Sequence, residues 1–109
     1  MKNILFITDN NIATRLLVEN TMGVARDKCY PIQISVMCEK DGIEHLRVSP
    51  CGLTLLSPSI RFYLNDRKNK GLPEDAKIVV VDSNIYGAAN GAALLDVIIK
   101  NFTFSPSAL

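Results

Sequence analysis

The sequence predicts an α/β protein, a three-layer sandwich in which a four-stranded parallel sheet is flanked by helices on both faces. Short apolar runs alternate with segments of helical periodicity along the chain, which is typical of parallel sheets. Residues 4–7 (ILFI) are all apolar, as expected for a strand that is covered on both faces. With 109 residues, 48% of them hydrophobic and 21% charged, the chain is suited to one packed domain.

The first half of the chain predicts two strands, each followed by a helix. The first strand is continuously apolar, and either Asn10 or Asn11 is a suitable cap for the helix after it. The second strand, PIQISVM, alternates apolar and polar residues. The expected elements are a strand at 2–8, a helix at 12–26, a strand at 31–37 and a short helical segment at 41–46.

The second half predicts two more strands and two more helices. Ser-Pro-Ser after the third strand is a helix start signal, and Gly71 and Pro73 end that helix. The fourth strand, KIVVVD, is followed by a segment rich in glycine. The expected elements are a strand at 52–56, a helix at 60–69, a strand at 77–82, a loop at 83–91 and a helix at 92–101.

Composition excludes several classes of function. Lys and Arg number 12 against 11 Asp and Glu, so no basic surface indicates nucleic acid or an anionic membrane as a partner. The early apolar run is too short for a signal peptide or a membrane span, which predicts a soluble cytoplasmic protein. Cys29, Cys38 and Cys51 show no paired spacing, and we expect reduced thiols that behave as small buried hydrophobes. With the single His45 they offer no zinc ligand set, so we expect no metal and no cofactor.

The turn after the first strand is the best candidate site. Ligands of parallel sheets bind beyond the carboxyl ends of the strands, where N–H groups at a helix start favour anions. Asparagines tolerate the left-handed backbone that such a loop needs, although the same residues are also suited to a plain turn and cap. The expected phosphate-binding loop comprises Asp9, Asn10, Asn11, Ile12, Ala13 and Thr14, and Ser57, Pro58, Asp82 and Tyr86 are further candidates on the same edge.

Three stretches resemble the enzyme IIB component of the sugar phosphotransferase system, lactose/cellobiose class. They are NILFITDNNIATRLLVEN, LTLLSPSIRFYLNDRKN and KIVVVDSNIYGAANGAALLDVI. In the third and most specific stretch, Asp82, Tyr86, Gly87 and Gly91 keep the family's spacing. The resemblance spans residues 2–102, which predicts a IIB-like domain at residues 1–103 and a flexible tail at 104–109.

The resemblance implies a role in a phosphoryl relay. In the family, a cysteine at the end of the first strand takes a phosphoryl group from a histidine of enzyme IIA. The group then passes to a sugar bound in the membrane component, enzyme IIC. Here Thr8 occupies the position of that cysteine, and the loop after it carries the charged Asp9. The first interpretation is therefore a IIB-like component of a phosphoenolpyruvate-dependent sugar transport system, with Thr8 at the acceptor position.

Two other interpretations remain open. The first is a non-catalytic regulatory or binding module that keeps the IIB fold and docks on a partner from the phosphotransferase system. The second is a receiver-like domain phosphorylated on Asp9. The acidic cluster and partner lysine that are usual in receivers are not recognisable in this sequence.

Overall fold

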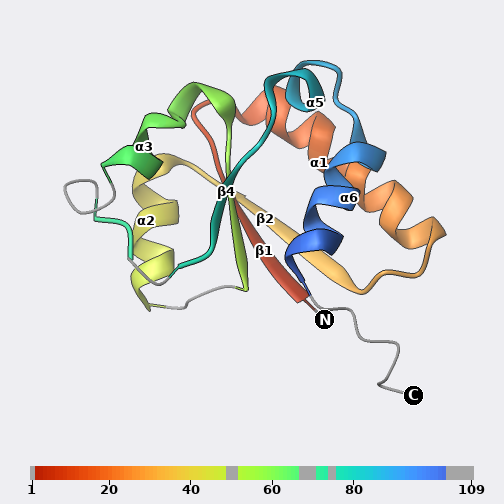
Figure 1. Cartoon of the computed structure of the whole chain (residues 1–109), viewed down its shortest axis with the longest axis horizontal. Helices are drawn as coiled ribbons and strands as arrows, with labels where there is room; N and C mark the ends of the chain where they lie inside the picture. The colour runs from red at the N-terminus through yellow and green to blue at the C-terminus, as the bar shows by residue number, and fades with distance from the viewer. Residues whose placement is uncertain (1, 49–51, 67–70, 74–75, 103–109) are drawn as a thin grey trace.

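The computed structural model describes residues 2–48, 52–66, 71–73 and 76–102 (Figure 1). Three predictions fall outside these residues: the flexible tail at 104–109, the last part of the helix expected at 60–69, and the burial of Cys51.

Four parallel strands form a single sheet in the order β2-β1-β3-β4. β1 is therefore central, with β2 hydrogen-bonded along one side and β3 along the other. The predicted four-stranded parallel sheet is confirmed. The strands are β1 (Lys2–Ile7), β2 (Ile32–Met37), β3 (Leu53–Leu56) and β4 (Ile78–Val80).

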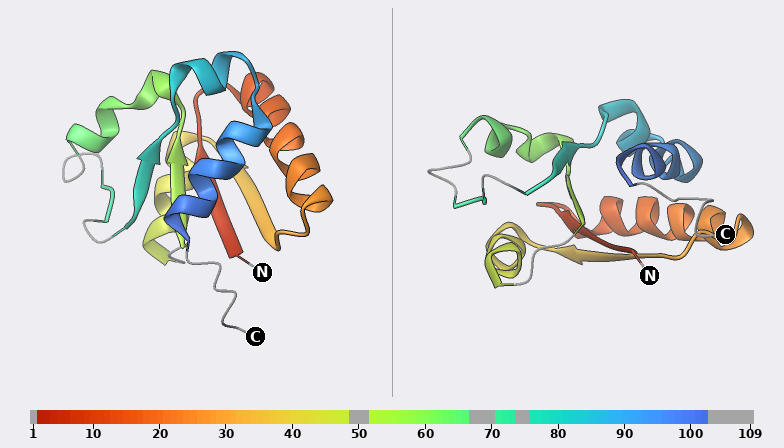
Figure 2. Two further views of the ribbon diagram at one scale, coloured as in Figure 1. Left: turned by 45° about the vertical axis from the view of Figure 1, so that its right-hand side comes forward. Right: turned by 60° about the horizontal axis from the view of Figure 1, so that its bottom comes forward.

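Helices cover both faces of the sheet, which confirms the predicted three layers (Figures 1 and 2). One face carries α1 (Asn11–Asp27), α5 (Ser83–Gly87) and α6 (Gly91–Asn101). The other carries α2 (Glu39–Val48), the short 3-10 helix η1 (Pro58–Ile60) and α3 (Phe62–Asn65).

The continuous apolar run in β1 contributes side chains to the hydrophobic cores on both faces of the sheet. Ile4 and Phe6 point into the core beneath α1 and α6, whereas Leu5 and Ile7 pack with Leu46 of α2 on the opposite face. Because successive strand residues alternate between faces, the part of a central strand that is covered on both sides is apolar on both faces, as residues 4–7 are here.

Two predicted elements differ from the structure. The expected loop at 83–91 contains helix α5, because the Asp82 side chain accepts hydrogen bonds from the backbone N–H groups of Asn84 and Ile85 and so caps a helical turn. The expected helix at 60–69 is divided, in its described part, into η1 and α3.

The two described cysteines are not buried, which corrects the prediction for them. Cys29 and Cys38 are both exposed. Cys29 follows α1 with a left-handed backbone (φ 59°), and Cys38 lies between β2 and α2. Both lie at the ends of elements, where a sequence pattern carries little information on burial.

Candidate functional site

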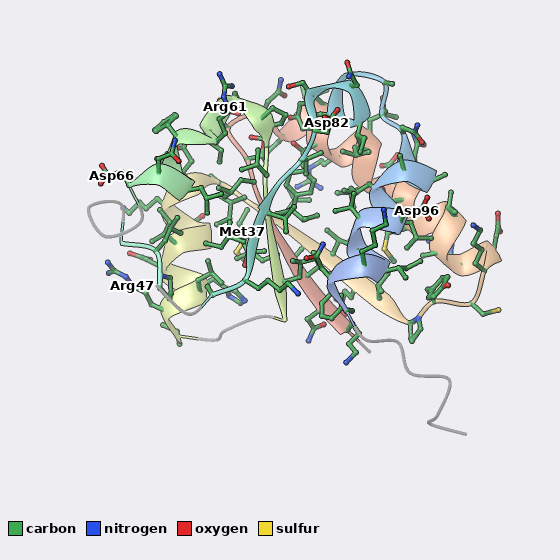
Figure 3. The ribbon with its side chains drawn as sticks, viewed as in Figure 1. Met37, Arg47, Arg61, Asp66, Asp82 and Asp96 are labelled. Atoms are coloured by element: carbon green, nitrogen blue, oxygen red, sulfur yellow. The ribbon has the colours of Figure 1, made fainter. Side chains whose placement is uncertain are left out.

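The carboxyl ends of the strands meet along the upper edge of the sheet in Figure 1. We call this edge the rim and define it as residues 8–14, 38–39, 57–63 and 82–86. Figure 3 shows Asp82 and Arg61 near this edge, whereas Asp96 lies lower on α6. In open parallel sheets this is the edge at which ligands bind.

Thr8 lies at the end of β1 with its hydroxyl enclosed by hydrogen bonds. The residue is 1% exposed. Its Oγ1 accepts from the backbone N–H of Asn10 at 3.0 Å and from the Thr14 hydroxyl at 2.8 Å, and it donates to the Asn10 carbonyl at 3.3 Å. The donor and acceptor capacity of the hydroxyl is thus used within the loop.

Tyr86 of α5 completes this hydrogen-bond network from the far end of the chain. Its hydroxyl lies 2.8 Å from Thr14 Oγ1 and 3.5 Å from the Asn10 carbonyl. Because the Thr14 hydroxyl hydrogen goes to Thr8, Tyr86 is the donor to Thr14. The chain Tyr86–Thr14–Thr8 therefore joins α5, α1 and β1, and it contains neither a carboxylate nor an imidazole that would take a proton from Thr8.

The Asp9 side chain points away from the Tyr86–Thr14–Thr8 chain, toward the serines of residues 57–59. Its Oδ1 accepts from the Ser59 hydroxyl at 2.6 Å and from the Ser57 hydroxyl at 3.4 Å. Ser57 is fully buried, whereas Asp9 and Ser59 are exposed. No described residue forms an ion pair with Asp9, so the rim carries an exposed carboxylate that hydroxyl groups hold in place.

The start of α1 is capped by Asn10, one of the two predicted cap residues. The Asn10 side chain accepts from the N–H of Ala13 at 3.3 Å, and its carbonyl accepts from the N–H of Thr14 at 3.2 Å. The N–H groups of Asn11 and Ile12 donate to no described group. The helix start thus keeps two of its usual free donors at the rim.

A second carboxylate lies on the same side as Asp9. The Tyr63 hydroxyl donates to Glu39 Oε2. This hydrogen bond, together with desolvation and the negative charges of Glu39 and Asp9, raises the pKa of Tyr63 to about 12. This pair was not predicted from the sequence, because the helix was expected to begin at residue 41. The available signal was the position of Glu39, two residues after the end of β2.

The remaining rim candidates are structural neighbours of the loop. Asp82 caps α5, and Pro58 begins η1, where its carbonyl accepts from Arg61 at 3.0 Å. Neither Asp82 nor Pro58 is hydrogen-bonded to Thr8 or Asp9. The structure therefore brings together two groups: Thr8, Thr14 and Tyr86 in one, and Asp9, Ser57 and Ser59 in the other.

Two apolar side chains of α1 are exposed beside the rim. Ile12 is 86% exposed and Leu16 is 53% exposed. They lie four residues apart, which places them on one face of the helix. Within the described residues, no group of three or more His, Cys, Asp or Glu side chains is arranged to hold a metal ion, and no helix is long and apolar enough to cross a membrane.

The sheet order and the polar turn after β1 define a class: parallel α/β sandwiches with a candidate site at the strand ends. Within that class, the solved structures that are similar to this chain include two IIB components. The lactose-specific IIB component domain of the phosphoenolpyruvate:carbohydrate phosphotransferase system from Streptococcus pneumoniae aligns with a TM-score of 0.71 and 14% identity, over 93% of this chain and 97% of that one.

The cellobiose-specific phosphotransferase IIB component protein from Borrelia burgdorferi aligns with a TM-score of 0.73 and 24% identity, over 94% of this chain and 92% of that one. No family model and no curated protein matches the sequence. The chain therefore has the fold of lactose- and cellobiose-specific IIB components, and the resemblance is confirmed at the level of the fold.

Proposed function

We propose that the protein is a IIB-like component of a lactose/cellobiose-type phosphotransferase system that docks on its partners through the rim without accepting a phosphoryl group at Thr8. The observation that carries the proposal is the state of the Thr8 hydroxyl, which is 1% exposed and hydrogen-bonded to both Asn10 and Thr14. The fold shared with two IIB components supports the choice of system.

The chemistry of threonine supports the same proposal. A cysteine at a helix start can attack as a thiolate, whereas a threonine hydroxyl needs an adjacent base. None of the hydrogen-bond partners of Thr8 is such a base. Attack would also require Thr8 Oγ1 to give up its bonds to Asn10 and Thr14. A phosphothreonine, once formed, is a stable ester and a poor donor to sugar.

The exposed apolar side chains of α1 would favour binding to a partner. Ile12 and Leu16 would bury apolar surface against a partner, while the Tyr86–Thr14–Thr8 chain keeps the adjoining loop in one conformation. The partners in this proposal are enzyme IIA and the membrane enzyme IIC. The relay through Thr8, which the resemblance implied, is the second candidate and is favoured by the shared fold alone.

Intact-protein mass spectrometry separates the two candidates. The protein is incubated with phosphoenolpyruvate, enzyme I, the carrier HPr and a lactose/cellobiose-type enzyme IIA, with a cysteine-containing IIB component labelled in parallel. We expect no gain of mass while calorimetry detects binding to enzyme IIA. A gain of one phosphoryl group mapped to Thr8 or Asp9 would instead establish a relay.

Restoring the cysteine alone is not expected to restore the acceptor. In Thr8→Cys the loop keeps its capping bonds, and the Asp9 carboxylate remains beside an incoming phosphoryl group. We expect labelling at least about tenfold slower than in the cysteine-containing control, because like charges at this range oppose approach. Labelling at the rate of the control would show that the charged loop is no obstacle.

A further inference from the structure

We propose that Asp9 is a specificity determinant that keeps phosphate-bearing groups off the rim, so that the protein binds the dephosphorylated form of its docking partner in preference to the phosphorylated form. The choice of partner rests on the proposed function. The exclusion of phosphate rests on the geometry of Asp9 itself.

The Asp9 carboxylate is exposed and is held by hydroxyl groups of residues 57–59. Ser59 donates to its Oδ1 at 2.6 Å, and the buried Ser57 adds a longer contact at 3.4 Å. An aspartate is ionised at neutral pH, and no described residue neutralises this one by an ion pair. The rim therefore presents a negative charge with a defined position.

This charge lies on the same edge of the sheet as the start of α1, although its carboxylate is bonded to Ser57 and Ser59 rather than to the helix. The N–H groups of Asn11 and Ile12 and the dipole of α1 favour a negative group. Asp9, two residues before α1 begins, supplies one from the chain itself. Glu39, held by the Tyr63 hydroxyl, adds a second carboxylate on the same side. A phosphate arriving there would be repelled by both carboxylates.

The unphosphorylated and phosphorylated forms of enzyme IIA differ in the charge that they would bring near the Asp9 carboxylate. A histidine side chain is neutral or singly positive, whereas a phosphohistidine carries about two negative charges. Coulomb's law gives roughly a tenfold loss of affinity for a dianion about 6 Å from one carboxylate in water. The preference should weaken as salt is added, because exposed charges are screened.

The first test measures binding of enzyme IIA in its two phosphorylation states. We expect the native protein to prefer the unphosphorylated form about tenfold and Asp9→Asn to lose that preference. Asp9→Glu should retain it. Asp96→Asn, which makes the same change of charge at an exposed site on α6, should also retain it. An equal preference in the native protein and in Asp9→Asn would overturn the inference.

The second test needs no partner. Inorganic phosphate is titrated into the isotope-labelled protein while the backbone amide signals of residues 9–14 are followed. We expect these signals to stay in place in the native protein and to move in Asp9→Asn. Equal movement in both would overturn the exclusion of phosphate and support the phosphate-binding role predicted for the loop. Absence of enzyme IIA binding in either state would count against the proposed function, and this titration would still decide the role of Asp9.

Discussion

Two buried threonines, Thr8 just after β1 and Thr54 in β3, differ in whether their hydroxyl groups are hydrogen-bonded. Thr8 Oγ1 accepts two hydrogen bonds and donates a third. Thr54 Oγ1, in β3, is buried with no hydrogen-bond partner among the described residues. An unsatisfied buried hydroxyl costs stability, whereas a satisfied one supports the groups that bond to it.

Replacing each hydroxyl by a methyl group should therefore change stability in opposite directions. Thr8→Val leaves the Asn10 N–H and the Thr14 hydroxyl without their acceptor, and we expect a loss of about 2 kcal/mol in the free energy of unfolding. Thr54→Val removes an unpaired polar group and should gain about 1 kcal/mol. Urea denaturation measures both, and a loss in both variants would contradict the assigned bonding.

The Tyr63–Glu39 pair predicts a pH dependence in the alkaline range. Hydrogen bonding to Glu39 is the main cause that raises the pKa of Tyr63 to about 12, from 10.0 in an exposed tyrosine. Because the folded-state pKa lies above the unfolded value, the contribution of Tyr63 to stability is complete below pH 10 and is lost as the pH rises toward 12.

Tyrosinate absorbance gives a direct measurement of this group. We expect the pKa of Tyr63 to fall back toward its usual value in Glu39→Gln, in which the charge of the acceptor is removed. Tyr63→Phe assigns the titration step, because that step disappears from the curve. A step that is unchanged in Glu39→Gln would show that burial, rather than Glu39, sets the pKa.

At the scale of elements, the contact between α1 and α6 depends on a missing side chain. A Cβ atom at Gly91 would lie 2.4 Å from the carbonyl carbon of Asn20 and 2.5 Å from the nitrogen of Thr21. The Asn20 side chain also donates to the Ala89 carbonyl at 2.9 Å, just before α6 begins. The two helices can approach this closely only because residue 91 is glycine.

Gly91→Ala should accordingly lower the free energy of unfolding by about 2 kcal/mol, since backbone atoms must shift to admit the methyl group. Gly23→Ala is the matched control. Gly23 lies within α1 and has nothing within 4 Å of its Cβ position, so this change should stabilise the helix by about 0.5–1 kcal/mol. Thermal denaturation compares the two variants, and equal effects would rule out the close approach.

The elements that the sequence predicted well are those with an unambiguous apolar pattern. ILFI in β1 and the periodic α1 and α6 could be read from residue type alone, because their burial follows strand or helix spacing. Helix α5 could not, since glycines suggested a loop and the capping role of Asp82 depends on local geometry. The exposure of Ile12 and Leu16 could not be predicted either, because helical periodicity alone does not show that these apolar side chains are exposed.

The position of the candidate site could be predicted from the sequence, but its hydrogen bonds could not. Parallel topology places the residues after each strand on one edge, which is how Thr8, Asp9 and Tyr86 came to be expected together. Some of the hydrogen bonds of the site join residues that are far apart in the sequence. Thr14 and Tyr86 are 72 residues apart, and Asp9 and Ser59 are 50 apart. A local sequence pattern cannot predict hydrogen bonds between residues this far apart.

For the molecule as a whole, the sheet order predicts which strands are the most resistant to local unfolding. β1 and β3 each have a strand on both sides, and the side chains of Leu5, Phe6 and Leu55 are fully buried. We expect their amide hydrogens to exchange with solvent only through global unfolding, more slowly than those of β2 and β4 at the edges. Hydrogen exchange followed by NMR measures this, and faster exchange in β1 than in β4 would contradict the central position of β1.

The central position of β1 also has a consequence during synthesis, because β1 comes first in the chain. β1 leaves the ribosome before any strand that it pairs with. Its register joins Ile4 to Ile34 on one side and to Leu53 on the other. Until residue 53 has emerged, one edge of an apolar strand has no partner, and such an edge is prone to pair with other chains. The nascent chain therefore carries an edge that is prone to aggregation until β3 has emerged.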